Sequence, residues 1–508
     1  MRSPSRCTTF RRLSSPWPHT EPSAAHRAAY ADAEPRSFWV SALPHRALHD
    51  PLTGTTDADL CIVGGGYTGL WAALHAKARA PERDVLVLEA TRCGAGASGR
   101  NGGFLEASLT HGLSNGLTRF PDEMEQLEAL GLENFDALRR DLEVHGIECE
   151  YEAGGDLAVA LEHHELDDLH AEVELLRQFG HDVELLDGPG IRAQLDSPTY
   201  LGGLWDRTGS ALVHPGRLAD GLRAAAVGAG VRVCELSPVR GLRAGRAARP
   251  GGAAGPGCGG WPGRASRGTV EVIAEGGVVN ARRVLLATSA YPPLLRSVRR
   301  YIAPVYDYAL MTEPLTGAQQ QSIGWAARQG VSDMGNQFHY YRPTQDGRIL
   351  WGGYDAVYSY GGDVGPHRDQ HDASFARLSQ HFFTTFPQLE SLRFSHRWGG
   401  AIDTCSRFSV FFGTAHGGRV AYALGYTGLG VGASRFGAAV ALDLLDGRHS
   451  AATELTMVRR RPVPFPPEPL RSAVIQLTRN RLAAADRHEG RRGAWLKTLD
   501  RLGLGFDS

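Results

Sequence analysis

The chain has 508 residues, of which 42% are hydrophobic and 21% charged, and its formal net charge is -1. This length allows more than one globular domain, and the near-neutral balance gives no electrostatic reason to expect nucleic acid or an anionic membrane as a partner. The seven cysteines are scattered and never show C-x-x-C spacing, so we expect no metal site and a reducing compartment, the cytoplasm.

The chain begins with a polar, proline-containing segment, and we expect residues 1–35 to form a disordered extension. It lacks the apolar stretch of a signal peptide, and no apolar run elsewhere approaches the ~20 residues of a membrane helix. A different pattern begins at residue 57. Apolar runs at 60–63 and 85–88 flank a glycine turn and a helix-periodic stretch through Lys77, which predicts a strand, a helix and a second strand.

The turn of this unit carries a dinucleotide-binding fingerprint. Gly64, Gly66 and Gly69 form G-x-G-x-x-G between strand and helix, and Glu89 stands at the end of the second strand. The glycines permit a tight turn, a close approach of the backbone to a pyrophosphate, and packing of helix on strand, while the carboxylate accepts from ribose hydroxyls. An acid at this position favours FAD or NAD over NADP.

Further elements follow in chain order. After the second strand comes "GAGASGRNGG" (94–103), where dense glycine surrounds Ser98, Arg100 and Asn101. We expect helices over residues 160–178, 214–230 and after 430, strands at 231–234, 270–273 and 284–287, a flexible insertion at 243–268, an antiparallel sheet within 304–394, and a tail over 451–508.

Taken together, these segments resemble the D-amino-acid oxidase (DAO) superfamily of FAD enzymes, the glycine and sarcosine oxidase group. The resemblance runs through "GAGASGRNGG", "VHPGRLADGL", "VLLATSAY" and "ALGYTGLGV", and "HYYRPTQDGRILWGG", "HRWGG" and "PFPPEP" are most similar to the γ-glutamylputrescine-oxidase-like branch. It implies a mixed α/β fold with a Rossmann-like FAD-binding domain (57–110, 205–300 and 395–450) and an antiparallel-sheet substrate domain (111–204 and 301–394). The implied reaction oxidises the C–N bond of an amine or amino acid to an imine, with hydride transfer to flavin N5.

The resemblance also implies which residues hold FAD. Arg100 and the run from Arg397 to Gly399 stand where some relatives attach flavin through His or Cys, so we expect noncovalent FAD. The expected contacts are Gly64, Gly66, Tyr67, Thr68, Gly69, Glu89, Ala90, Ala97, Ser98, Arg100, Asn101, Gly102, Gly103, Val239, Ala287, Thr288, Gly428, Leu429, Gly430 and Val431.

Substrate residues are less constrained by the pattern. The resemblance implies an arginine that pairs with a substrate carboxylate: Arg397 in "HRWGG" occupies the comparable place, and Arg342 in "YYRPT" is its rival. We expect His339 and Tyr341 in an aromatic pocket together with Tyr306, Tyr308, Trp351 and Tyr354.

The electron acceptor and the reaction class stay open at this point. Lys77 and Lys497 lie outside the region where sarcosine oxidases place an oxygen-activating lysine, so Arg100, Arg397 or His339 would have to replace it, or the enzyme would be a dehydrogenase. Two other classes fit the cofactor: an RNA-modifying flavoprotein, and a flavin-binding subunit without activity.

Overall fold

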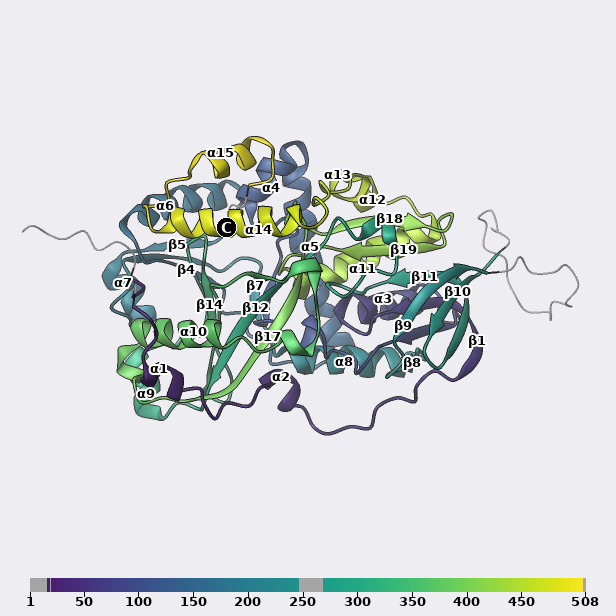
Figure 1. Cartoon of the computed structure of the whole chain (residues 1–508), viewed down its shortest axis with the longest axis horizontal. Coiled ribbons are helices and arrows are strands. Elements are labelled where there is room, and N and C mark those ends of the chain that lie inside the picture. Colours follow the sequence, from purple (N-terminus) through teal and green to yellow (C-terminus); the bar gives the residue numbers. More distant parts are fainter. Residues whose placement is uncertain (1–15, 19, 246–267, 506–508) are drawn as a thin grey trace, which may run out of the picture.

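A largely parallel sheet forms the right-hand part of the molecule in Figure 1, in a computed structural model that describes residues 16–18, 20–245 and 268–505. Its strands run in the order β18-β19-β11-β1-β2-β8, and a hairpin of β9 and β10 attaches to β11. The pairs of β1 with β11 and β2, of β11 with β19 and of β2 with β8 are parallel, so their carboxyl ends share one edge. The strands are β1 (Gly54–Val63), β2 (Val85–Leu88), β8 (Arg232–Cys234), β9 (Val239–Ala244), β10 (Val270–Ala274), β11 (Gly277–Leu286), β18 (Phe411–Ala415) and β19 (Val420–Leu424).

The sheet is covered on both faces, which explains its continuous apolar runs. Along β1, Leu60 and Ile62 pack with the helices α3 (Tyr67–Arg79), α8 (Pro215–Gly228) and α11 (Gly430–Asp446), while Cys61 and Val63 pack beneath the β9–β10 hairpin. The predicted strand-helix-strand unit is therefore confirmed.

A second, nine-stranded sheet lies on the left of Figure 1, with β16-β12-β15-β14-β13-β4-β6-β5 in order and β17 paired to β12. All its pairs are antiparallel except β13 with β4, which is parallel. Helix α10 (Asp372–Thr385) packs on one face. The strands are β4 (Asp156–Ala160), β5 (Val183–Leu186), β6 (Gly202–Asp206), β12 (Ala303–Thr312), β13 (Gly330–Asp333), β14 (His339–Pro343), β15 (Ile349–Gly353), β16 (Val357–Tyr358) and β17 (Phe394–Thr404).

The position of β17 corrects one expected boundary. We placed residues 395–450 in the FAD-binding domain, but β17 pairs with β12 over nearly its whole length, from Phe394 to Thr404. This pairing buries apolar side chains, because Trp398 packs against Ala309 and Met311 of β12. The chain returns to the parallel sheet only at β18.

The N-terminal segment is a second correction, because residues 20–35 are ordered rather than a disordered extension. Glu34 bridges to His396 at the side of β17, with Glu34 N donating to Ser395 O at 2.9 Å and Arg397 N donating to Glu34 O at 2.9 Å. Tyr30 and Trp39 are fully buried. We call residues 29–41, which include helix α2 (Phe38–Ser41), the N-terminal strap. Residues 1–15, and residues 246–267 of the expected insertion, lie outside the described part.

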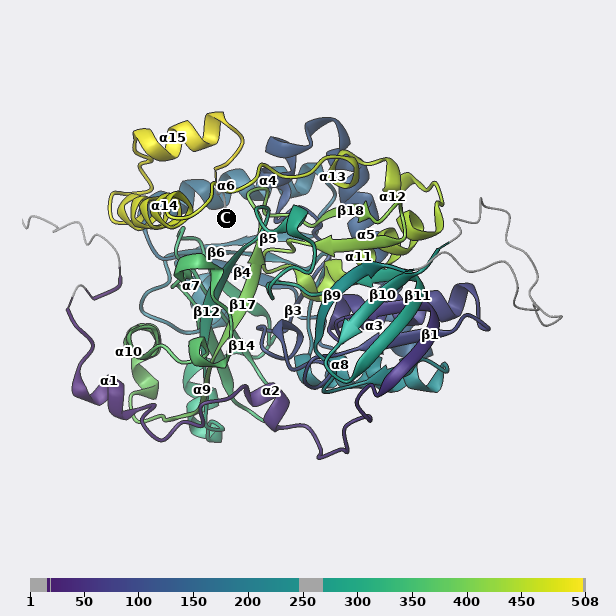
Figure 2. The ribbon, with the colours of Figure 1, turned by 45° about the vertical axis from the view of Figure 1, so that its right-hand side comes forward.

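The remaining helices pack on both halves: α6 contacts β5 and β6 of the second sheet, whereas α13 contacts β18 and α5 contacts α11. None that the structure describes is long and apolar enough to cross a membrane. The expected tail is helical: Figure 2 shows α14 and α15 above the nine-stranded sheet, away from β1. These elements are α1 (Ala24–Ala28), α4 (Leu113–Arg119), α5 (Met124–Val144), α6 (His163–Gln178), α7 (Gly188–Gln194), α9 (Gly317–Ile323), α12 (Ala451–Glu454), α13 (Thr456–Arg459), α14 (Leu470–Asp486), α15 (Ala494–Arg501), β3 (Phe104–Glu106) and β7 (Ser210–Leu212).

Candidate functional site

The turn between β1 and α3 tolerates only glycine at two positions. A Cβ on Gly64, whose φ is +111°, would lie 2.3 Å from the Ala287 carbonyl oxygen, and one on Gly69 would lie 1.9 Å from the Gly64 oxygen. Strand, turn and helix therefore pack closely, and the amides of the first turn of α3 point out of the helix end without intrahelical acceptors. This is the geometry of a pyrophosphate site.

Glu89 stands one residue beyond β2, beside this turn. Its carboxylate accepts from Gly65 N at 2.8 Å and from Thr91 N at 2.9 Å. Burial raises the pKa of Glu89, while those backbone bonds act in the opposite direction. Ala90 follows it, and Arg92, which the sequence reasoning missed, has a buried Nη2 with no hydrogen-bond partner in the described chain.

The glycine-rich run 94–103 lies against the same turn. Tyr67 N, in the first turn of α3, donates to Ser98 Oγ at 2.9 Å, so Ser98 stands at the N-terminus of that helix. Asn101 instead organises the run itself: its Nδ2 donates to the carbonyls of Ala97 and Ser98, both at 3.0 Å, and its Oδ1 accepts from Gly103 N. We expected Asn101 to donate to the cofactor, and the structure gives its amide to the backbone.

Arg100 is likewise committed to protein partners. Its guanidinium donates to the Ala95 carbonyl at 3.0 Å and the Gly399 carbonyl at 3.1 Å and forms an ion pair with Asp369 at 2.5 Å. The side chain therefore joins the run to β17 instead of standing free as a cofactor donor or an oxygen-activating cation.

Three successive carbonyls of the run are held by distant side chains. Ser37 Oγ donates to Gly99 O at 2.6 Å, Trp398 Nε1 to Arg100 O at 2.9 Å, and Trp39 Nε1 to Asn101 O at 2.8 Å. Two donors come from the N-terminal strap and one from β17. The run is thus fixed between the two sheets.

Three other expected cofactor segments also meet this edge of the parallel sheet. Ala287 and Thr288 follow β11, and Ala287 N donates to Val63 O at 2.9 Å. Val239 opens β9, two residues after Ser237, whose N donates to Glu89 O. The segment from Gly428 to Val431 forms the start of α11, which packs against β3 just beyond the run.

The nine-stranded sheet presents one face to the run. On β14 the side chains alternate, and Tyr340 and Arg342 are on the run side: a Cβ on Gly102 would lie 2.8 Å from Tyr340 Cε2, and one on Gly103 would lie 2.7 Å from Arg342 Nη1. Tyr340 hydroxyl donates to Asp307 Oδ2 at 2.5 Å. We call the face that carries Asp307, Tyr340, Arg342 and Trp398 the run-facing side.

His339 and Tyr341 lie on the opposite face, which corrects their expected place in the pocket. Tyr341 is fully buried, and its hydroxyl is 2.6 Å from that of Tyr200. His339 is also fully buried and lies between Asp333 Oδ2 at 2.5 Å and His381 Nδ1 at 3.0 Å. Period-two alternation separates them from Tyr340. Tyr306, Tyr308, Trp351 and Tyr354 also belong to this far side, packing or stacking with its core residues.

Arg397 lies on the far face too. Its guanidinium carbon is 5.6 Å from the centre of the Tyr30 ring and 5.7 Å from that of Phe375, a cation–π arrangement between the strap and α10. The structure does not bring Arg397 to the glycine-rich run. Lys77 donates to backbone carbonyls at the end of α3, and Lys497 belongs to α15, so neither reaches the run.

Arg342, the rival arginine, is fully buried on the run-facing side. Its Nη1 donates to Val213 O at 2.6 Å, whereas its Nη2 has no hydrogen-bond partner in the described chain. Burial lowers the pKa of Arg342 to about 10, so the guanidinium stays charged at neutral pH. A buried, charged donor without an acceptor is costly unless a ligand satisfies it.

Asp307 is the acid of this face. Burial raises the pKa of Asp307 to about 6, although the bond from Tyr340 lowers it. The carboxyl is therefore poised to change charge just below neutral pH, beside the hydroxyl that reaches the run.

The parallel sheet with its glycine turn, the acid after β2 and the second sheet facing the run define a dinucleotide-binding oxidoreductase of two packed sheets. Residues 59–444 match the DAO family, described as FAD dependent oxidoreductase, and the chain belongs to that family. It is an FAD-dependent oxidoreductase.

Curated relatives and solved structures agree with this assignment. The chain is 30% identical over 410 residues to "Probable oxidoreductase OrdL" of Haemophilus influenzae (78% of this chain, 84% of that protein) and 31% identical over 424 residues to "Gamma-glutamylputrescine oxidoreductase" of Escherichia coli (81% and 89%). Glycine oxidase from Geobacillus kaustophilus has the same fold, with a TM-score of 0.64 at 20% identity over 80% of this chain and 99% of that one. The predicted family, fold class and cofactor are confirmed.

The residues present fit FAD. Gly64 and Gly69 leave no room for a side chain in the turn, Glu89 offers a carboxylate beside it, and two helices begin at the same edge. The unpaired Nη2 atoms of Arg92 and Arg342 add buried donors that a ligand would satisfy.

Proposed function

We propose that the chain oxidises the C–N bond of an amine or amino acid, and that the substrate binds between the glycine-rich run and the run-facing side of the nine-stranded sheet. The observation that carries this proposal is the Tyr340–Asp307 pair directly beside Gly102. The names of two relatives, a gamma-glutamylputrescine oxidoreductase and a glycine oxidase, support the substrate class. Bound FAD would accept the hydride from the carbon next to nitrogen, and water would then hydrolyse the resulting imine to a carbonyl compound and an amine or ammonia.

Tyr340 is the residue that we assign to the reacting amine. Because its O–H is donated to Asp307, the free lone pairs of the phenolic oxygen can accept an N–H from the substrate. Asp307 acts as a positioning residue that fixes this orientation once it is ionised. An amine held in this way would present its neighbouring C–H bond toward the glycine-rich run, whose residues would help to hold FAD.

Arg342 is the residue that we assign to an anionic group of the substrate. It replaces Arg397 in that role, because Arg342 lies next to Gly103 with an unpaired Nη2 and Arg397 packs between Tyr30 and Phe375. An arginine that is buried and charged before substrate arrives needs no further desolvation to bind a carboxylate.

An anaerobic panel of amines and amino acids, followed through loss of the flavin's visible absorbance, tests the reaction. We expect at least one to reduce the flavin stoichiometrically. If none does, the RNA-modifying and inactive alternatives are favoured instead.

A matched pair of variants tests the location. Tyr340→Phe removes the hydroxyl beside Gly102, and Tyr341→Phe removes the neighbouring hydroxyl on the far face. We expect kcat/KM to fall by about 10- to 100-fold in the first variant and by about twofold or less in the second. Equal losses would remove the run-facing side from the substrate site.

We further propose that FAD is held without a covalent bond and that the protein works in the cytoplasm. The yield of hydrogen peroxide per turnover will show whether oxygen is the electron acceptor. The five cysteines in the described ranges are all free, which supports a reducing compartment. By the family resemblance, Arg100 and the run from Arg397 to Gly399 stand where some relatives attach flavin through His or Cys, which supports noncovalent binding.

A further inference from the structure

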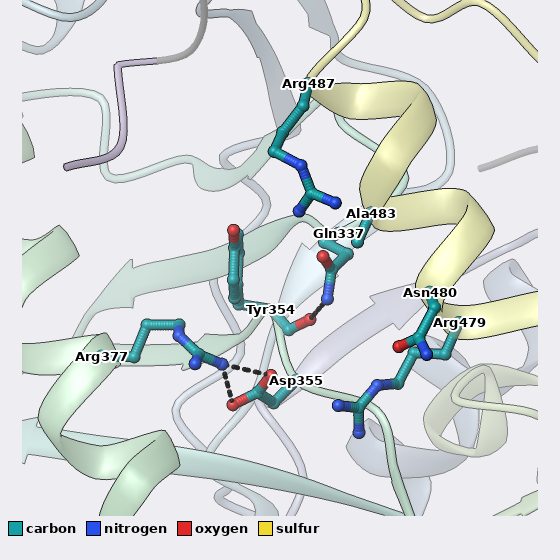
Figure 3. A pocket seen from close by; sticks show the side chains of 8 residues that line it. All are labelled: Gln337, Tyr354, Asp355, Arg377, Arg479, Asn480, Ala483 and Arg487. Carbon is teal, nitrogen blue, oxygen red and sulfur yellow. Dashed lines mark hydrogen bonds and ion pairs between the residues drawn. The ribbon is translucent and has the colours of Figure 1, made fainter. Parts of the chain in front are cut away.

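A pocket lies between α14, which follows the residues that match the family, and the far face of the nine-stranded sheet. This open pocket has a volume of about 330 Å³, and Figure 3 shows its walls: α14 on one side, and Gln337, Tyr354 and Asp355 from the loops next to β14 and β15 on the other. Tyr354 stacks on His339, with 5.0 Å between ring centres, so the pocket opens on the far face of the sheet. It is separate from the proposed substrate site.

The helical wall has a repeat of four residues. Arg479, Ala483 and Arg487 line the pocket from α14 and its first following residue, so they lie on one face of the helix. Ala483 leaves the middle of this face hollow. The backbones of the two arginines are about 12 Å apart along the axis, and their guanidinium groups enter the pocket from its two ends (Figure 3).

The carboxylates around the pocket already have partners. Asp355 accepts from Arg377 Nη1, with both oxygens at 2.8 Å, and from Ser374 Oγ at 2.7 Å. Asp486 accepts from Asn336 N and Nδ2 and from Gln337 N, at 2.6 to 3.0 Å, which fixes the end of α14 to the sheet.

Arg479 and Arg487 are left without an acidic partner. Within the part of the chain that the structure describes, Arg479 has one long bond to Ala356 O at 3.5 Å, and Arg487 forms no side-chain hydrogen bond or ion pair. The residues that line the pocket therefore carry an excess of two positive charges, and Asp486, which accepts only from neutral N–H groups beside the pocket, reduces the local excess to one. The Gln337 and Asn480 amides are neutral polar groups in the same lining.

We propose that this pocket binds a small organic dicarboxylate. Each terminal guanidinium can pair with one carboxylate through two N–H donors, and the separation of the two arginines favours an extended dianion over a compact one. The charge of Arg377 is neutralised by its ion pair with Asp355, so Arg479 and Arg487 are the residues that would bind the two carboxylates.

Calorimetric titration of the FAD-loaded full chain with glutarate, at low ionic strength, tests the site. Glutarate has no amine and cannot be oxidised at a C–N bond. We expect binding in the millimolar range or tighter, weakened by at least about tenfold in the double variant Arg479→Gln/Arg487→Gln. Arg481→Gln, an exposed arginine of the same helix that does not line the pocket, is the matched control and should bind as the unaltered protein does.

Each contrary result of the titration contradicts a different part of the proposal. No binding to the unaltered chain, or binding that survives in the double variant, overturns the site. Butyrate that binds as tightly as glutarate overturns the requirement for two carboxylates, and inorganic phosphate that binds more tightly overturns the extended ligand. We expect the double variant to oxidise amines with unaltered kcat/KM. A failure of the dicarboxylate proposal would therefore leave the proposed amine oxidation unaffected.

Discussion

Trp39→Phe removes one hydrogen bond between the N-terminal strap and the glycine-rich run. The indole Nε1 donates to Asn101 O at 2.8 Å, and phenylalanine retains most of the ring but no donor. A buried carbonyl that loses its donor costs about 1–3 kcal/mol. Because this bond is only partly buried, we take the lower end, about 1 kcal/mol, which corresponds to about fivefold in a dissociation constant if the cost falls on the FAD-bound form.

Titration of the apoprotein with FAD, followed by quenching of flavin fluorescence, measures this change. Trp325→Phe is the control, since Trp325 is also buried but its Nε1 has no partner in the described chain. Both variants should lose thermal stability through the smaller ring, and only Trp39→Phe should weaken FAD. Equal FAD affinity in the two variants, with equal loss of stability, would refute the idea that the strap positions the run.

Four further outcomes follow from the site. Arg342→Met should raise KM by at least about tenfold for substrates that carry a carboxylate and leave KM for simple amines nearly unchanged, which steady-state kinetics on paired substrates will show. Asp307→Asn should flatten the pH profile of kcat/KM near pH 6: the pKa of Asp307 is raised to about 6, so its carboxylate forms as pH rises through that value, and activity of the unaltered enzyme should rise with it. Because the pKa of Asp307 is raised in the folded protein, its protonated form stabilises the fold at low pH, and this stabilisation is lost as pH rises through about 6. The free energy of unfolding, measured by denaturation at pH 5 and pH 7, checks this. Arg397→Ala should leave KM unchanged and lower the melting temperature, because it removes cation–π contacts on the far face; a large rise in KM would return Arg397 to the site. Acid precipitation should release all the flavin into the supernatant, and flavin that stays with the pellet would contradict noncovalent binding.

The cofactor half of the fold was predictable because its signals are local. The apolar run from Leu60 to Val63, the glycines of the fingerprint and the acid at Glu89 all lie within one strand-helix-strand unit, where periodicity and turn chemistry act over a few residues. The helix that begins at Gly430 is local in the same sense. These elements could be predicted without knowing which other elements pack against them.

The substrate face was not predictable from type alone, because β14 carries two adjacent tyrosines. Tyr340 and Tyr341 have the same chemistry, and a strand places one on each face. Only the register with β15 and the packing of α10 decide which one meets the run. One of the two tyrosines faces the proposed substrate site and the other lies in the core. The aromatic content of the segment does not show which is which.

The N-terminal strap was missed for a different reason. Its sequence is polar and rich in alanine, and the few aromatic residues that dock it are too widely spaced to show a helical or strand period. The polar and cation–π partners of Tyr30 and Trp39 include residues more than sixty positions away, namely Asn101, Arg342 and Asp372. Contacts of this kind leave no local pattern.

The same long-range contacts explain how a run so rich in glycine can hold a cofactor. Each glycine costs about 0.5–1 kcal/mol of conformational freedom relative to alanine, so the run would be mobile if it were held only at its ends. The polar side chains within it stabilise its own backbone, and Ser37, Trp398 and Trp39 hold three successive carbonyls from outside. Because Trp398 and Gly399 belong to the nine-stranded sheet, the bond from Trp398 to Arg100 O and the bond from the Arg100 side chain to Gly399 O join the run to β17. A shift of β17 must therefore move the run, and in the proposed site it would change the distance between cofactor and substrate.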